Sequence, residues 1–496
     1  MNDQEKRIML RKPNAIGNSK GYEQVLSWIL LLVLFGGAIP AAIWSGKMIS
    51  ANGNLLFVLA INLAYAGTFT VLMLVLSYLQ LSVKQPVPIP RRKRTVTLAM
   101  AAHNEQDVIV DAVSAALKQS QQLDQIIVVN DGSTDQTFVV LQDHFALRPK
   151  SQVQGGYQST THSNLIVIDK PHGGKAGALN MALGLAKADL FITVDADSIL
   201  ANDAISCMVD GMAADPKVVA AGGMVKAING YWGEARSGNY VGLPSGMLAK
   251  LQWVEYATGF VWRFGWAKLN IQLLLSGSFS GFQTRILRAV GGFDPTSLTE
   301  DYEVCYRLHA YCRQQGVDYA IVTLSDALCY TLVPDTLIGY LHQRIRWFQG
   351  FLQTLWRYRR YILRPSYGWF GVFALPIKVI DALSPLLAVL AATLIAMAWF
   401  DCNSMVLVPA ALFLGARWLI EFIYATLLLS LHHVFIQSEL KLADKIRAYL
   451  LGPVNFMYHT CVWYIYGVVA HIRLWFGVWS WSKNRATIQT ETETRH

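Results

Sequence analysis

Long apolar stretches divide this chain into three parts. Two stretches precede a central segment and three follow it, at residues 25–44, 55–81, 382–399, 405–431 and 449–475. Each can cross a hydrocarbon core of about 30 Å as an α-helix. Hydrophobic residues make up 53% of the chain and charged residues only 15%, which is too apolar for an ordinary soluble protein. The chain is therefore predicted to be a membrane protein with a further folded domain in its centre.

Basic residues beside the apolar stretches predict which parts face the cytoplasm. Arg91-Arg92-Lys93-Arg94 follows the second stretch, and residues 1–24 are also basic. The positive-inside rule puts both on the cytoplasmic side, so residues 25–82 would form a hairpin of two transmembrane helices. Residues 382–475 would add about three spans, followed by a polar tail at 476–496. This arrangement predicts a multi-pass protein of the plasma (inner) membrane with a cytoplasmic domain. It explains the net charge of +9 without a nucleic-acid partner.

Residues 95–336 have the alternating pattern of an α/β domain. Short apolar runs predict five strands, at residues 95–101, 125–130, 164–168, 190–195 and 218–221. Amphipathic stretches between them predict helices, for example at 105–119 and 175–187. Strands that alternate with helices indicate a mostly parallel sheet with helices on both faces. Residues 147–163 are polar and are predicted to form a surface loop.

Carboxylates follow two of the predicted strands directly. Asp131 and Gly132 come after the second strand, and Asp195 and Asp197 end the fourth. Open α/β sheets bind ligands at the carboxyl ends of their strands. Two carboxylates there can hold Mg²⁺ or Mn²⁺, which usually share their ligands with substrate phosphates. The alternatives are an ordinary strand-to-helix turn at Asp131 and a solvated acidic pair at Asp195 and Asp197.

A glycine-rich turn with a lysine opens the helix predicted at 175–187. Free N–H groups at a helix start, together with Lys175, make a site that suits an anion. The turn is not a P-loop, because Asp169 stands where the first glycine would be and Ala176 follows the lysine. A nucleoside triphosphatase is therefore excluded at this position.

Two further clusters lie late in the central part of the chain. In Thr299-Glu300-Asp301, a carboxylate could take a proton from an attacking hydroxyl. The alternative is a helix N-terminus with Thr299 as its cap and acidic residues in the first turn. Gln343, Arg346 and Trp347 would share one face of a helix, where the guanidinium could bind a diphosphate. The alternative is an interfacial helix, because residues 337–380 mix arginines with aromatic residues. Residues 247–275 are also aromatic and amphipathic, and could equally be a buried domain helix.

Taken in this order, the motifs resemble those of the processive, membrane-embedded family-2 glycosyltransferases. That group includes the synthases of cellulose, hyaluronan, chitin oligosaccharides and poly-N-acetylglucosamine. The resemblance covers about 95–350. It implies a GT-A-like, Rossmann-like α/β domain that binds a nucleotide-sugar on a mostly parallel sheet, joined to an α-helical transmembrane region.

The resemblance also implies a role for each matching residue. The nucleotide-sugar would be contacted by Glu105, Asp131, Lys175 and Asp195. Asp197 would bind the divalent cation, Mg²⁺ or Mn²⁺, and Asp301 would be the catalytic base beside Glu300. The acceptor end and the diphosphate would be held by Gln343, Arg346 and Trp347.

The function implied is inverting transfer from a UDP-sugar to the end of a growing β-linked polysaccharide, which the protein could export through its own helices. Asn130 stands where the family often has an acid, and residues 276–281 match no single synthase, so the sugar is left open. One alternative is a non-processive transferase that glycosylates a membrane lipid or polyprenyl phosphate. Another is an inactive receptor or scaffold subunit. The expected partners are the UDP-sugar, a glycan or lipid acceptor, the bilayer and a small accessory membrane subunit.

Overall fold

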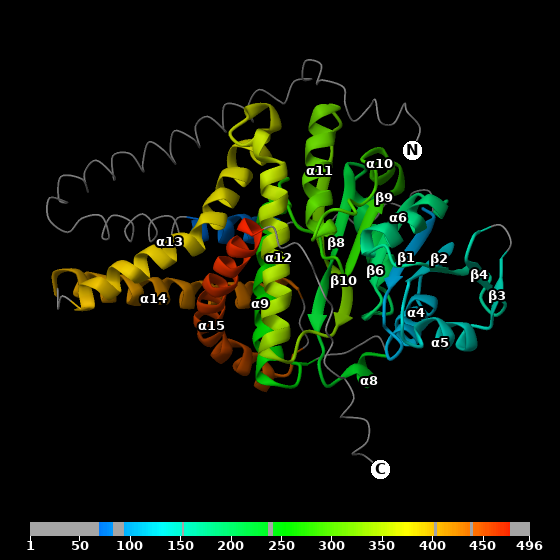
Figure 1. The fold of residues 1–496 in the computed structure, drawn as a ribbon, viewed down its shortest axis with the longest axis horizontal. Coiled ribbons are helices and arrows are strands. Elements are labelled where there is room, and N and C mark those ends of the chain that lie inside the picture. Colours follow the sequence, from blue (N-terminus) through cyan, green and yellow to red (C-terminus); the bar gives the residue numbers. More distant parts are fainter. Residues whose placement is uncertain are drawn as a thin grey trace, which may run out of the picture.

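The computed structural model describes residues 69–82, 94–150, 153–236, 242–400, 404–436 and 440–476. The first apolar stretch, the N-terminal part of the second, residues 91–93 and the polar tail lie outside this part of the chain. A sheet-containing domain forms one side of the molecule, and the long helices α13 (Leu375–Phe400) and α14 (Ser404–Phe435) extend on the other side (Figure 1). α15 (Leu442–Trp475) packs against both of them.

Ten strands of the described residues form one sheet in the order β3-β4-β5-β2-β1-β6-β9-β8-β10-β7. The strands are β1 (Val96–Ala102), β2 (Gln125–Asp131), β3 (Leu147–Pro149), β4 (Gly156–Ser159), β5 (Leu165–Lys170), β6 (Leu190–Asp195), β7 (Ser198–Leu200), β8 (Val218–Ala227), β9 (Phe279–Gln283) and β10 (Ala320–Thr331). Strands β5, β2, β1 and β6 are parallel neighbours, and β8 is parallel to β10. The prediction of an α/β domain with a largely parallel sheet is therefore confirmed.

Helices cover both faces of the sheet, as predicted. They are α4 (Ile109–Leu117), α5 (Thr137–His144), α6 (Lys175–Leu185), α7 (Ala204–Ala214), α8 (Trp232–Ala235), α10 (Thr284–Ala289) and α11 (Glu300–Gln314). Successive side chains of β1 enter different cores, because side chains along a strand alternate between faces. Leu98 and Met100 pack in the core that includes α4 and α7, whereas Ala99 packs in the core that includes α6 and α11.

The surface loop predicted at residues 147–163 is wrong. β3 and β4 pair antiparallel there and extend the sheet beyond β5. Their polar side chains belong to a solvent-facing edge, where polar residues protect a sheet from further pairing. Tyr157 anchors this edge, because its ring packs against Phe138 of α5 with centroids 4.9 Å apart. β9, which lies antiparallel between β6 and β8, was also not predicted.

The aromatic stretch at residues 247–275 proves to be mainly a buried domain helix. α9 (Met247–Lys268) lies between the sheet and helices α14 and α15, with Trp253, Phe260 and Phe264 buried. The second aromatic stretch forms α12 (Leu337–Arg357), which continues through three short helices (Arg359–Tyr361, Pro365–Tyr367 and Phe370–Ala374) into α13. The domain and the long helices are thus joined by direct packing as well as by the chain.

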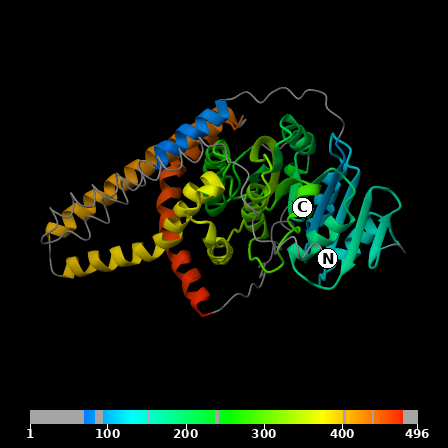
Figure 2. The same cartoon turned by 90° about the horizontal axis from the view of Figure 1, so that it is seen from above.

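Two stretches of the described residues are long and apolar enough to cross a membrane, Phe370–Leu390 and Leu414–Phe435. Fewer than half of the residues in each stretch are buried, and large side chains such as Leu387, Leu390 and Leu419 are exposed. Exposed apolar surface of this kind marks a contact with another protein or with a membrane. α15 does not meet the same criterion. The helix Phe69–Ser82 lies beside α14 (Figure 2), where Tyr78 contacts Phe435.

Candidate active site

The parallel register brings the carboxylates of Asp131 and Asp195 to one edge of the sheet. Asp131 ends β2 and Asp195 ends β6, and β1 lies between these two strands. The third element at this edge is the start of α6, which follows β5. The sequence-based expectation that these motifs share the carboxyl edge is met by the geometry.

Asp131 is buried, and its carboxylate is held by the turn before α6. It accepts hydrogen bonds from the N–H groups of Gly173 (2.9 Å) and Gly174 (2.8 Å), and it contacts the Lys170 ammonium. Gly174 has a φ of +82°, which favours glycine. Asp131 therefore fixes the backbone that presents Lys175. Its predicted contact with the nucleotide stays a prediction.

The Lys175 ammonium joins motifs that are far apart in the sequence. Its Nζ lies 2.5 Å from Asp195 Oδ1 and 3.3 Å from Glu300 Oε1. Burial on its own would lower the pKa of Lys175, but the carboxylates of Asp195, Glu300 and Asp301 raise the pKa well above its usual range. Lys175 is therefore a permanent cation at the meeting point of β6, α6 and α11.

Asp195 and Asp197 are the residues at this edge that could hold a divalent cation. Asp195 is partly exposed, and its Oδ2 accepts a hydrogen bond of 3.1 Å from the Ser278 hydroxyl. Within the described residues, no group of three or more His, Cys, Asp or Glu side chains could hold a metal. Two carboxylates suit Mg²⁺ or Mn²⁺ completed by diphosphate oxygens and water, and do not suit a closed zinc site.

Asp301 lies in the first turn of α11, directly against the turn that precedes β9. A Cβ added at Gly277 would lie 2.7 Å from Asp301 Oδ2 and 3.3 Å from Lys175 Nζ. Burial and the charge of Glu300 raise the pKa of Asp301 to about 6, against the lowering effect of Lys175 and Arg346. Such a carboxylate is largely ionised at neutral pH yet binds a proton readily, as a general base requires.

Thr299 occupies the N-cap position of α11, but its side chain forms no cap hydrogen bond. The hydroxyl is buried without a hydrogen-bond partner in the described structure. The Thr299 side chain packs against Gly350 of α12, where an added Cβ would collide with it. The capping role considered for Thr299 is therefore wrong, because close packing against α12 directs the hydroxyl away from the free N–H groups of the helix.

One face of α12 packs against the segment that leads into Glu300 and Asp301 and forms hydrogen bonds with it. We call this face of the helix the α12 clamp. Its members are spaced four, three and four positions apart, which aligns them on one face of the helix: Arg346, Gly350, Gln353 and Arg357. Arg346 donates to the Leu298 carbonyl at 3.3 Å. Gln353 accepts from the Leu298 N–H at 3.0 Å and donates to the Thr296 carbonyl at 2.9 Å.

Arg357 completes the clamp at the far end of α12. It pairs with Asp294 and donates to the Thr296 hydroxyl at 3.0 Å. Two motifs that are distant in the sequence, Thr299-Glu300-Asp301 and Gln343-x-x-Arg346-Trp347, are thereby joined as one structural unit.

Arg344 is a functional neighbour that the sequence analysis missed. Its guanidinium is buried, forms an ion pair of 2.7 Å with Glu255 of α9, and lies 4.2 Å from the ring centroid of Trp347. It also contacts the Gln343 side chain at 3.3 Å. Arg344 therefore fixes the orientation of both predicted acceptor residues. The alternation of arginine and aromatic residues in this stretch is the sequence feature that could have indicated the role of Arg344.

Gly277 and Ser278 belong to the small-residue segment 276–281 that the resemblance pointed to, but their contacts with Asp301 and Asp195 were not predicted. Arg263 of α9 was missed, since a single arginine in a helix is common. Its Nη1 atom is buried and has no hydrogen-bond partner among the described residues, and its charge interacts with Asp301. Glu105 is buried in the segment between β1 and α4, where its N–H donates to the Thr137 hydroxyl at 2.7 Å.

Comparison with known proteins identifies relatives of this arrangement. The family model "Glycosyl transferase family 2" matches residues 97–274, and "Glycosyl transferase family group 2" matches residues 190–431. The poly-beta-1,6-N-acetyl-D-glucosamine synthase of Staphylococcus aureus (strain MSSA476) is 31% identical over 280 residues, which are 55% of this chain and 58% of the synthase. The corresponding synthase of Staphylococcus epidermidis (strain ATCC 35984) is 29% identical over 267 residues, 53% of this chain and 56% of that one. The chain thus spans less than two thirds of the length of these relatives.

A solved structure shares the fold. It is the mannosyltransferase PcManGT from Pyrobaculum calidifontis in complex with GDP-Man and Mn²⁺, with a TM-score of 0.53 and 20% sequence identity. The similarity covers 80% of this chain and 98% of the mannosyltransferase. At this level of identity the similarity shows a shared GT-A-like fold.

Proposed function

The chain belongs to glycosyltransferase family 2, and on that premise we propose that it extends a β-linked polysaccharide from a UDP-sugar. The observation that carries this proposal is the Lys175 ammonium, which lies between Asp195 and Glu300 and beside Asp301. A donor-side acid, a cation and an acceptor-side acid are thus within reach of one bound sugar. The names of the relatives support N-acetylglucosamine as the sugar, and therefore UDP-N-acetylglucosamine as the donor.

In the proposed reaction, the acceptor hydroxyl oxygen attacks the anomeric carbon of the donor from the side opposite UDP. The new glycosidic bond forms as the bond to the diphosphate breaks, so the configuration inverts and UDP leaves. Asp301 receives the hydroxyl proton. Lys175 and Arg346 supply positive charge toward the leaving diphosphate, a form of electrostatic stabilisation that requires prearranged groups. Asp195 and Asp197 would hold Mg²⁺ or Mn²⁺, which would neutralise the diphosphate when bound.

The acceptor end would lie beside α12, against Gln343 and Trp347. Stacking of Arg344 on Trp347 leaves the indole rigid, which suits it as a platform for a sugar ring. α12 leads into the candidate span that begins at Phe370, so the product would emerge close to the membrane helices. This supports a cytoplasmic catalytic domain on a multi-pass plasma-membrane protein, with export along the helices.

The test is to incubate the purified full-length chain with radiolabelled UDP-N-acetylglucosamine, UDP-glucose or UDP-glucuronate and Mn²⁺, and to size the product. We expect long polymer from UDP-N-acetylglucosamine alone, and none after the metal is chelated. A lipid-soluble product of one fixed size would replace the polymer proposal with single transfer to a lipid. The absence of product and of UDP release with all three donors would indicate an inactive subunit.

The pH dependence should report the ionisation of Asp301. Because its pKa is about 6 and the base must be ionised, kcat/KM should rise about tenfold between pH 5 and pH 7. Glu300→Gln removes a negative charge that raises this pKa, so the acidic limb should move to lower pH. The measurement is a pH–rate profile of UDP release, with the exposed Asp318→Asn as the matched charge control. An acidic limb that Glu300→Gln leaves in place would argue against Asp301 as the group that titrates.

A further inference from the structure

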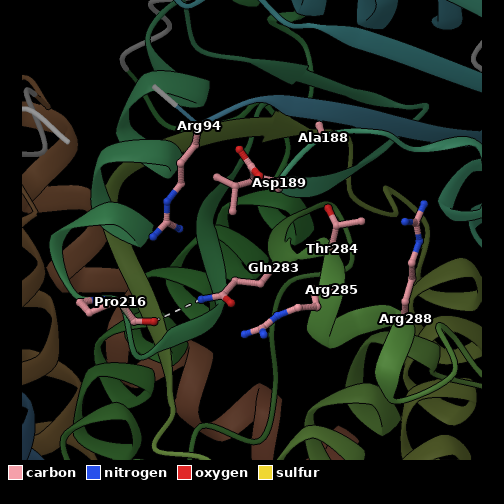
Figure 3. A pocket seen from close by; sticks show the side chains of 9 residues that line it. Arg94, Ala188, Asp189, Pro216, Gln283, Thr284, Arg285 and Arg288 are labelled. Carbon is pink, nitrogen blue, oxygen red and sulfur yellow. Dashed lines mark hydrogen bonds between the residues drawn. The ribbon is translucent and has the colours of Figure 1, made fainter. Parts of the chain in front are cut away.

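A pocket lies at the opposite edge of the sheet from the candidate active site. Its volume is about 720 Å³, within the range of small-molecule sites. It is lined by residues at the starts of β1, β6 and β8, at the end of β9 and on α10: Arg94, Ala188, Asp189, Leu190, Pro216, Gln283, Thr284, Arg285 and Arg288 (Figure 3). Because β9 is antiparallel to β6, it delivers its last residues to this amino edge.

The lining of the pocket is strongly basic, with three arginines against a single carboxylate. In Figure 3 the side chains of Arg94 and Arg285 extend toward Gln283 from different elements. Neither forms an ion pair or hydrogen bond with another described residue. Asp189 forms no ion pair with either of them in the described part of the chain; its Oδ2 accepts hydrogen bonds of 3.1 Å from the N–H and the hydroxyl of Thr95.

Thr284 also lines the pocket, although its hydroxyl is buried. Thr284 is 4% exposed, and its Oγ1 atom has no hydrogen-bond partner in the described residues. Buried hydroxyls normally find a partner, since an unsatisfied one costs free energy. The pocket surface does not include this closed-off hydroxyl, so a bound anion would be held by the two arginines, whose donors can bind several acceptor oxygens.

We propose that this pocket binds a phosphate-bearing anion, which is either a soluble phosphate ester or the headgroup of an anionic lipid. Arginine suits this class because its planar guanidinium binds two phosphate oxygens at once. Arg94 would be the principal ligand on one wall and Arg285 on the other. The site is separate from the donor site, and its existence does not depend on the transfer reaction.

Two rigid elements connect this pocket to the candidate active site. Arg288 donates to the carbonyls of Leu183 (2.8 Å) and Ala186 (2.5 Å) at the end of α6, and Lys175 begins that helix. β9 runs from the pocket to Ser278, which contacts Asp195. An anion in the pocket would therefore be held by the same elements that position Lys175 and Ser278.

The experiment titrates the full-length chain in detergent with one of two probes that carry the same headgroup. Glycerol 3-phosphate tests the soluble source, and dihexanoyl phosphatidic acid tests the lipid source. UDP and Mg²⁺ are kept saturating, so that the proposed donor site is filled and its occupancy is measured separately. We expect one probe molecule bound per chain, with affinity that falls as salt is added.

Arg94→Gln and Arg285→Gln should each weaken the binding about tenfold, because each removes a charge-assisted contact. Arg148→Gln is the matched control. It removes an exposed arginine on β3, the outermost strand of the sheet, and should have no effect on binding. Binding of both probes supports a soluble ester, and binding of phosphatidic acid alone supports a lipid headgroup. Binding of neither, or equal losses in all three variants, would overturn the proposal. If the wild-type chain does not bind UDP at all, that result would instead count against the proposed function.

Discussion

Asp301→Asn should lower kcat by about a hundredfold to ten-thousandfold while UDP binding is retained. The substitution keeps the size and planarity of the side chain but removes its ability to take a proton. The Asp301 carboxylate lies beside Lys175 and Arg346, and its pKa of about 6 places the proton acceptor close to the working pH. UDP contacts are expected at Asp131, Lys175 and Asp195 instead, so nucleotide affinity should change little.

The measurement pairs the initial rate of polymer formation with the affinity for UDP, on the wild type and the variant. Asp326→Asn is the control, because it makes the same chemical change at an exposed position of β10. A loss of less than tenfold in Asp301→Asn would remove this residue as the base. A parallel loss of UDP binding would instead assign Asp301 to the donor site.

Gly277→Ala should reduce turnover by about tenfold to a hundredfold with little change in thermal stability. The new Cβ would lie 2.7 Å from Asp301 Oδ2 and 3.3 Å from Lys175 Nζ, so both charged groups must move. Both atoms are the ends of side chains, which can shift without disturbing the core, so the free energy of unfolding is largely preserved. Displacement of a catalytic group by about 1 Å can cost about a hundredfold in rate.

The experiment compares kcat and Tm of Gly277→Ala with those of Gly184→Ala. Gly184 lies within α6, and a Cβ there would meet no atom within 4 Å, so this variant should keep full activity. Wild-type turnover in Gly277→Ala would mean that the turn does not press on Asp301. A large fall in Tm would mean that the turn carries stability, and the loss of rate would then not be specific.

Much of the candidate site could be predicted because it depends on local patterns. Asp131 and Asp195 follow apolar runs, and the carboxyl ends of parallel strands meet at one edge whichever helices connect them. Lys175 and Glu300 also lie at the starts of helices, and the residues next to them in the sequence predict those helix starts. The binding and catalytic roles assigned to these residues stay predictions.

Other parts could not be predicted because they depend on residues that meet only after folding. Thr299 satisfies every local preference for a helix cap, yet Gly350 packs against its side chain. The α12 clamp joins α12 to the segment before α11. Nothing in the sequence of either segment predicts that the two are in contact. β3 and β4 were missed because a polar edge strand has the same composition as a loop.

The sequence by itself determined the α/β domain and the motifs that stand at strand and helix ends, and it predicted apolar stretches that overlap both candidate spans of the described residues. These follow from hydrophobic periodicity and from turn chemistry, which act between near neighbours. The tertiary structure alone decided that β9 enters the sheet antiparallel. That direction carries Ser278 to Asp195 and Gln283 to the opposite edge. It also decided that Lys175 bridges Asp195 and Glu300. Both depend on long-range packing, in which the identity of the partner is set by the shape of the whole core.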